Sequence, residues 1–157
     1  MKQHKKLPLL AGGFILVTLL VWFWIFFVRT SYTVDETVSN FKLTPLNGVE
    51  LSLEGSRRSG SLEVTYDGEG YIVIDLSRSP LRIEQLQEDG WHRIQSDQLF
   101  WGASETVSKT QSYHDEFRWK ELLGGPLDPG TYRAILFYGN GAAEIYTFST
   151  AAEFTVS

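Results

Sequence analysis

The stretch that decides the fold of this chain is LGGPLDPGTYRAILFY, residues 123–138. It places three glycines and two prolines directly before a run of residues that favour β-strands. Proline removes a donor from a sheet ladder and glycine weakens a strand, so the first half of the stretch cannot lie inside a sheet. Asp128-Pro129-Gly130 therefore predicts a tight turn, in which the proline fixes φ and Gly130 tolerates a positive φ.

A tyrosine follows two residues after this turn, at the point where a strand is expected to begin. In immunoglobulin-like sandwiches a tyrosine in this place forms a tyrosine corner, in which its hydroxyl bonds to backbone a few residues upstream. We therefore assign Pro129, Gly130 and Tyr132 a structural role in the turn and the corner. The cysteine that follows such a tyrosine in antibody domains is replaced here by Ala134.

Short β-like runs separated by turn residues occupy the rest of the chain after its first 29 residues. Residues 71–77 are apolar on both faces, as in a central strand, and residues 80–94 predict a hairpin with Asp89-Gly90 as its turn. Residues 96–112 are the least regular part, and one helical turn is expected only at 119–125. The pattern predicts an all-β fold: an immunoglobulin-like antiparallel β-sandwich of about seven to eight strands.

The N-terminal segment has a different character. Lys2, Lys5 and Lys6 precede Leu7–Val28, a run of 22 residues without a charge. At about 1.5 Å per residue a helix of this length spans a hydrocarbon core of about 30 Å. The three lysines before the run predict a cytoplasmic N-terminus. We expect a cytoplasmic tail over 1–6, a transmembrane signal-anchor helix over 7–29 and an extracytoplasmic remainder, in a single-pass protein of the cell membrane.

Two alternatives remain open for this segment. A cleaved signal peptide shares the positive start, but its apolar region is usually about 7–15 residues long and ends at small residues. This run is longer and ends in WFWIFFV, and its best cleavage site, after Thr30, is poor. A buried core helix is the second alternative, although the apolar residues lie all round the helix and form no stripe.

Residues 30–44 are polar and predict a linker to a domain over 45–157. All 19 acidic residues follow residue 29, whereas four of the 14 basic residues do not, which leaves the outer part with a net charge of about −9. This charge argues against nucleic acid as a partner, because phosphate binding needs a basic surface. It also argues against a domain that lies on an anionic membrane surface.

The sequence offers little for catalysis. It has no cysteine, which excludes disulfides, cysteine zinc sites and thiol nucleophiles. It also lacks the usual hydrolase, nucleotide and zinc motifs. His114 and Glu116 would share one face of a strand, but two ligands without a third make a weak metal site. We therefore expect no enzyme, no cofactor and no metal.

Three stretches, residues 79–94, 117–137 and 152–156, resemble the bacterial immunoglobulin-like domains of Gram-positive cell-surface proteins. The most specific part is a Leu-x-Pro-Gly-x-Tyr-Arg pattern, which here runs from Leu127 to Arg133. The resemblance covers about residues 45–157. It implies a domain of an anchored surface protein and supplies no catalytic residues. This chain lacks the lipid-modified cysteine of many such proteins, which leaves the N-terminal helix as its anchor.

Four residues are candidates for binding. Phe100 and Trp101 lie in the irregular segment, where an exposed aromatic pair stacks on a sugar or contacts a partner, unless Trp101 closes one end of the core. If Tyr132 faces inward, Ile135 and Phe137 face outward and mark an interaction patch, unless the irregular segment or another copy covers them. Trp91 and Trp119 are expected in the core.

These observations predict a non-catalytic binding or adhesion module at the bacterial cell surface. Its partners would be the membrane, through Leu7–Val28, and another protein or a cell-wall component. The first alternative is an accessory or regulatory subunit that associates with another membrane protein through the helix. The second is a small enzyme.

Overall fold

A computed structural model describes residues 17–18, 32–76, 81–95, 103–141 and 147–157. The chain divides into two compact units, Met1–Thr30 and Ser31–Ser157. Of the first unit only Val17 and Thr18 are described, and both are helical. The expected tail and membrane helix otherwise lie outside the described residues. Among the residues that are described, no helix is long and apolar enough to span a bilayer.

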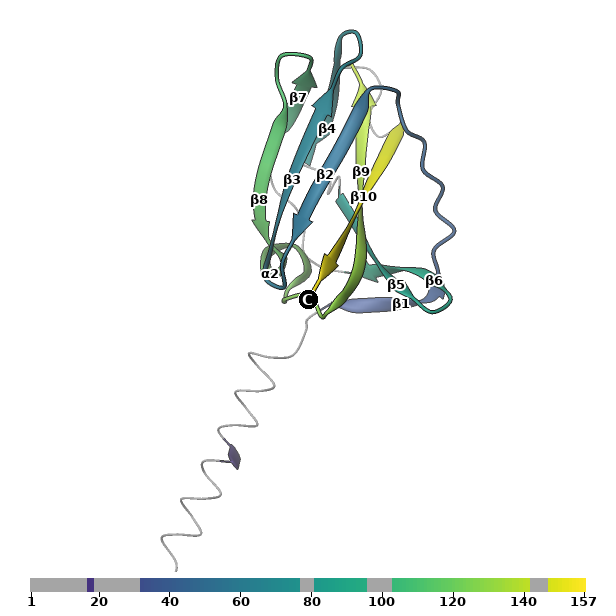
Figure 1. Cartoon of the computed structure of the whole chain (residues 1–157), viewed down its shortest axis with the longest axis vertical. Coiled ribbons are helices and arrows are strands. Elements are labelled where there is room, and N and C mark those ends of the chain that lie inside the picture. The colour runs from purple at the N-terminus through teal and green to yellow at the C-terminus, as the bar shows by residue number, and fades with distance from the viewer. Residues whose placement is uncertain (1–16, 19–31, 77–80, 96–102, 142–146) are drawn as a thin grey trace, which may run out of the picture. The chain divides into compact units, whose positions relative to one another are not determined.

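The described part of the second unit is mostly β-strand, and its one helix is a single short turn (Figure 1). Its elements are β1 (Thr33–Val38), β2 (Val49–Gly55), β3 (Ser59–Tyr66), β4 (Tyr71–Asp75), β5 (Leu81–Gln87), β6 (Gly90–Gln95), β7 (Ser104–Ser108), β8 (Tyr113–Arg118), α2 (Trp119–Leu123), β9 (Gly130–Asn140) and β10 (Phe148–Val156). The expected helical turn is thus present as α2. The described residues form ten strands, more than the seven or eight expected.

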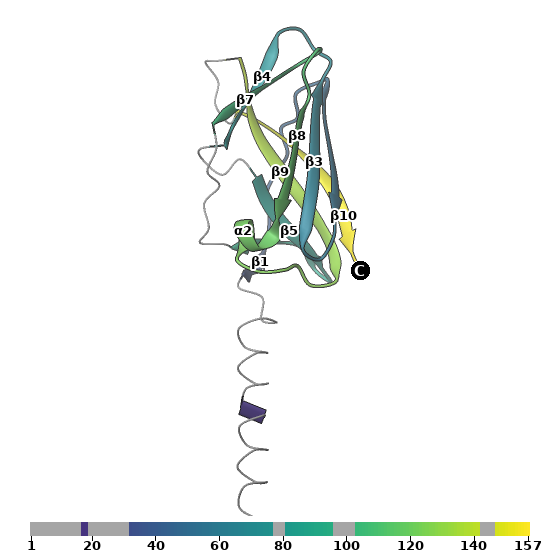
Figure 2. The ribbon, with the colours of Figure 1, turned by 90° about the vertical axis from the view of Figure 1, so that its left-hand side faces the viewer.

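The strands form two antiparallel sheets, which Figure 2 shows as two layers. The smaller sheet has the order β2-β3-β8. In the larger sheet β9 is central: β10 pairs with it along nine residues, and β5 and β4 also pair with it. Strand β6 pairs with β5, β7 pairs with β4, and β1 lies outside β6. The all-β, sandwich-like architecture is therefore confirmed.

Two of the additional strands lie where no strand was expected. β1 falls inside residues 30–44, which were predicted as a linker, and β7 falls inside the irregular segment 96–112. Both lie at sheet edges, and most of their residues are polar; β1 is largely exposed, whereas β7 places only Val107 in the core. Backbone hydrogen bonds to one neighbouring strand hold an edge strand in place. Its sequence therefore does not need the alternation of apolar and polar residues by which a strand is predicted.

The predicted hairpin is present as β5 and β6, but its turn lies one residue earlier than expected. Gln87 pairs with Gly90, which leaves Glu88 and Asp89 as the two turn residues. Gly90 begins β6 with a φ of 143°. A Cβ on Gly90 would lie 2.9 Å from Cγ1 of Val38, so this glycine serves a close approach of β1.

The core between the sheets contains a series of aromatic rings. Phe117 meets Trp119 edge-on at 4.9 Å, and Phe154 stacks on Trp119 and on Tyr132, each at 5.5 Å. Trp119 is fully buried, as expected, and its Nε1 donates to the Ser56 carbonyl oxygen at 2.8 Å. These rings come from β8, α2, β9 and β10, and they join the two sheets at one end.

Residues 39–46, here called the strap, join β1 to β2 along the side of the larger sheet, beyond β10 (Figure 1). The strap begins where the Ser39 amide donates to the Trp91 carbonyl oxygen at 2.7 Å. It reaches β10 through a bond of 3.0 Å from the Ser149 amide to the Thr44 carbonyl oxygen. At its end the Leu46 amide donates to the Tyr138 hydroxyl at 3.1 Å. The strap is therefore bonded to three strands of one sheet.

Candidate functional site

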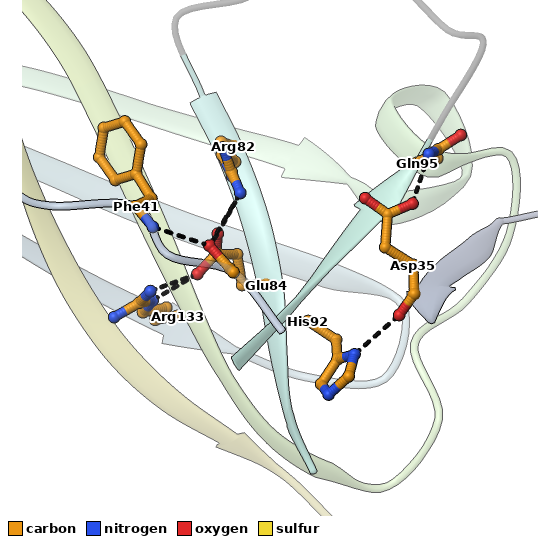
Figure 3. A network of polar contacts seen from close by, with 8 residues as sticks. Asp35, Phe41, Arg82, Glu84, His92, Gln95 and Arg133 are labelled. Atoms are coloured by element: carbon orange, nitrogen blue, oxygen red, sulfur yellow. Dashed lines mark hydrogen bonds and ion pairs between the residues drawn. The ribbon is translucent and has the colours of Figure 1, made fainter. Parts of the chain in front are cut away.

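A cluster of charged side chains lies beneath the strap, on the face of the larger sheet that points away from the core (Figure 3). Its centre is Glu84, which has no accessible surface. Arg82 Nη2 lies 2.6 Å from Glu84 Oε1, and Arg133 Nε donates to Glu84 Oε2 at 2.7 Å. The cross-strand register places Glu84 opposite Arg133, which explains why β5 and β9 bring these two residues together.

The strap closes this cluster from above. Ser39 Oγ donates to Glu84 Oε1 at 2.6 Å and accepts from Arg82 Nη2 at 3.0 Å. The Phe41 ring lies 5.2 Å from the Arg82 guanidinium carbon and meets the Phe137 ring edge-on at 5.4 Å. On the other side the Arg133 guanidinium carbon lies 4.7 Å from the centre of the Trp91 ring. Both arginines therefore pair with the carboxylate and stack on an aromatic ring.

This arrangement keeps Glu84 ionised. Burial alone would raise the pKa of the Glu84 carboxyl, but the bonds from Ser39 and Arg133 and the charge of Arg82 outweigh it and lower the pKa below its usual value. An ionised carboxylate without solvent access can neither donate a proton nor reach a substrate. The cluster, here called the Glu84 clamp, therefore fastens the strap to the sheet.

A second polar contact fastens β1. His92 is 2% exposed, and its Nδ1 lies 2.7 Å from the Asp35 carbonyl oxygen, as Figure 3 also shows. Its Nε2 lies 2.8 Å from Oδ1 of Asp89. A carbonyl oxygen and a carboxylate only accept, so both ring nitrogens carry hydrogen in the form that satisfies both contacts. The bond to the Asp35 backbone and that to Asp89 accordingly raise the pKa of His92, although burial opposes them.

Ile135 and Phe137 were expected to face outward and either to form a patch or to be covered, and Ile135 is covered. Ile135 has no accessible surface, and Phe137 is half-buried beneath the Phe41 ring. Ile135 lies outside the main core cluster, as the alternation along β9 requires, and on the same face Phe41 packs on Phe137. Phe41 belongs to the segment that was predicted as a linker. Phe100 and Trp101 lie outside the described residues.

Two of the exposed apolar side chains lie beside the β5–β6 turn. Leu86 is 45% exposed, and it pairs across the hairpin with the half-buried Trp91. Val38, 38% exposed, lies over Gly90 at the same end of the hairpin. Val38, Leu86 and Trp91 are here called the hairpin patch. Sequence reasoning missed this patch because Trp91 was expected in the core and Val38 in a linker.

The tyrosine corner has the expected hydrogen bond. Tyr132 is fully buried, and its hydroxyl donates to the Asp128 carbonyl oxygen at 2.7 Å. Gln85 Nε2 donates to the same hydroxyl at 3.3 Å. The turn differs in detail: Pro129 lies at a bend, but Gly130 already begins β9 and its φ is not positive. The positive φ of this stretch belongs to Gly124, at 84°, which ends α2.

His114 and Glu116 do share one face of β8, with His114 Nε2 3.9 Å from Glu116 Oε1. Their side chains are 58% and 81% exposed. No group of three or more potential metal ligands occurs among the residues that the structure describes.

The sequence matches no model of a known protein family, and no curated protein shows significant similarity to it. The resemblance to bacterial immunoglobulin-like domains therefore stays a prediction.

Proposed function

We propose that this chain is a membrane-anchored protein with an extracytoplasmic immunoglobulin-like domain, which acts as a non-catalytic binding or adhesion module at the bacterial cell surface. The observation that carries the proposal is the Tyr132–Asp128 hydrogen bond of 2.7 Å at the start of β9. Immunoglobulin-like sandwiches have this bond at the start of the strand that runs centrally in one sheet. The strand order around β9, facing β2-β3-β8, supports the same assignment.

The hairpin patch is the surface that we propose for protein binding. It combines two exposed aliphatic side chains with Trp91, which stacks on Arg133. Tryptophan and arginine are the residues that most often dominate protein interfaces. The Glu84 clamp and the strap hold this surface rigid, which reduces the entropy lost when a partner binds.

The second candidate function is an accessory subunit of another membrane protein. It is favoured by the short connection to the domain, since only residues 29–31 separate Val28 from Tyr32. A connection of this length spans at most about 14 Å between the two Cα atoms. The domain would then stay close to the membrane and to any partner embedded in it.

Crosslinking in intact cells tests both candidates. The full chain, tagged at its C-terminus, is crosslinked and purified from membranes, and the proteins or wall fragments bound to it are identified. We expect Leu86→Asp to abolish capture, and Tyr71→Asp, which changes a side chain that is 40% exposed on β4, to leave capture unchanged. Loss of capture on replacement of residues 7–28 by an unrelated membrane helix would support the accessory subunit instead. A shortened, secreted product would contradict the anchor.

A further inference from the structure

The first strand of the domain, β1, is held to β6 by an irregular ladder. Val34 pairs with Ile94. The register then shifts before the next paired residue, Val38, which lies opposite His92. Between these two pairs the Asp35 carbonyl oxygen lies 2.7 Å from Nδ1 of His92 (Figure 3). The imidazole ring therefore supplies a contact to β1 at the place where the regular backbone ladder is interrupted.

The buried imidazole ring of His92 lies between two groups that only accept hydrogen bonds. One is the Asp35 carbonyl oxygen, and the other is Oδ1 of Asp89 in the β5–β6 turn, 2.8 Å from Nε2. A protonated ring donates to both. A neutral ring carries one hydrogen, so it loses one contact, and its remaining bond is no longer charge-assisted and is roughly half as strong. Loss of the proton therefore weakens the link between β1 and the hairpin.

His92 is the group near this link that ordinarily changes its charge close to neutral pH. The charges of Asp89 and Asp35 both act on it. On β5 the residue opposite His92 is the uncharged Gln85, which donates to the Tyr132 hydroxyl at 3.3 Å. Burial raises the pKa of Tyr132, which keeps this hydroxyl uncharged. The remaining charged residues of β1, β5, β6 and the turn are exposed or lie on the other face of the sheet: Glu36, Arg82, Glu84, Glu88 and Arg93.

The same link positions the hairpin patch. Val38, which belongs to the patch, lies opposite His92 at the end of β1. Its neighbour Ser39 donates its amide to the Trp91 carbonyl oxygen at 2.7 Å. Val38 therefore lies over Gly90 and beside Trp91 only while the end of β1 stays on β6.

We propose that His92 is a pH-sensitive latch, whose protonated ring holds β1 on β6 and keeps the hairpin patch assembled, and whose neutral ring loosens both. The proposal rests on the hairpin patch of the proposed function and adds its regulation. The two contacts raise the pKa of His92, so the latch is closed below about pH 6.5 and opens as the pH rises through the higher value of the folded state. Binding through the patch should accordingly be stronger at the lower pH.

Hydrogen exchange of the full chain in non-ionic detergent tests the latch without a partner. Protection factors, which correct for the intrinsic effect of pH on exchange, are compared at about pH 6 and about pH 8.5. We expect residues 34–39 to lose protection at least about tenfold at the higher pH, the effect of losing one hydrogen bond to a charged group. Residues 60–66 of β3 should keep theirs.

Two substitutions distinguish the latch from a general effect of pH. In Asp89→Asn the new amide can donate to Nε2 of a neutral ring, while Nδ1 still donates to the Asp35 carbonyl oxygen. We expect this variant to keep the protection of residues 34–39 at the higher pH. His114→Gln is the control, because it removes a histidine whose side chain is 58% exposed on β8, and it should behave as the parent does.

The outcomes separate this proposal from the proposed function. Equal protection of residues 34–39 at both pH values in the parent would overturn the latch, as would a pH dependence that Asp89→Asn leaves unchanged. An equal loss of protection in β3 would show general loosening of the domain and would overturn it too. Crosslinking in intact cells at both pH values then tests the patch. Capture that Leu86→Asp does not affect at about pH 6 would contradict the patch as the interface, whereas the exchange result would still establish the latch.

Discussion

Replacing Glu84 by glutamine should loosen the strap and destabilise the domain. The substitution keeps the size of the side chain but removes the negative charge between Arg82 and Arg133. Loss of one partner from a buried ion pair usually costs about 3–5 kcal/mol. The two arginine side chains retain 22% and 14% exposure, so water compensates them in part. We therefore expect a loss of about 2–4 kcal/mol in the free energy of unfolding.

The measurement is urea unfolding of the full chain in non-ionic detergent, followed by pulse proteolysis. Glu63→Gln is the control, because it makes the same chemical change at an exposed position of β3 and should stay within about 0.5 kcal/mol of the parent. Hydrogen exchange shows which part of the fold is loosened. The strap amides should lose more protection than the amides of β3, because Ser39 loses its bond to the carboxylate. The reasoning would be refuted if the two variants were equally stable.

The pH dependence gives an independent check on the same residue. The pKa of Glu84 lies below its usual value of 4.5, so its contribution to stability is fully present above about pH 4.5. As the pH falls through the lower pKa of the folded state, the carboxylate gains a proton and the contribution is lost. The Glu84→Gln variant should show a smaller loss of stability over this acidic range than the parent chain.

Three further changes should act at separate places in the fold. Tyr132→Phe removes the hydroxyl that donates to a buried backbone carbonyl, and should cost about 1–3 kcal/mol in urea unfolding. Gly55→Ala places a Cβ 2.2 Å from Cδ2 of Phe154, and should lower the free energy of unfolding by about 1–3 kcal/mol. A variant as stable as the parent would contradict the close packing of β2 on β10. The raised pKa of His92 means that its contribution is present below about pH 6.5 and is lost as the pH rises through the higher folded value. The urea concentration at the midpoint of unfolding should therefore decrease as the pH is raised from about 5.5 to about 8.5. His92→Gln should weaken this pH dependence.

The sequence predicted the parts of the fold that depend on local chemistry. The turn residues before β9 and the following tyrosine predicted a hydrogen bond from the tyrosine hydroxyl to upstream backbone, and Tyr132 forms this bond. The apolar alternation of β2, β3 and β8 predicted strands that cover a core. These elements can be predicted from the sequence because each needs particular residues at particular positions, whichever strands it pairs with.

The strap was not predictable in the same way. Residues 39–46 have the composition of a linker, and nothing in their pattern shows that Phe41 reaches Phe137, nearly one hundred positions away. Arg82 and Glu84 alternate with apolar residues along β5, which is the pattern of a strand with one exposed face. Only the pairing of β5 with β9 shows that a second arginine lies opposite Glu84. Long-range register, rather than local propensity, therefore decides which charged residues are buried.

The clamp also determines which surface remains for a partner. Were the outer face of the larger sheet bare, Ile135 and Phe137 would be its apolar centre. Because Ile135 is buried and Phe41 packs on Phe137, this face offers little apolar surface, whereas Val38 and Leu86 of the hairpin patch are exposed. The Glu84→Gln variant should therefore affect binding in one of two ways. If the hairpin patch is the interface, loosening the strap disturbs Trp91 through Arg133 and weakens capture of a partner. If the covered face is the interface, the same variant strengthens capture by exposing Ile135, so the sign of the change identifies the surface.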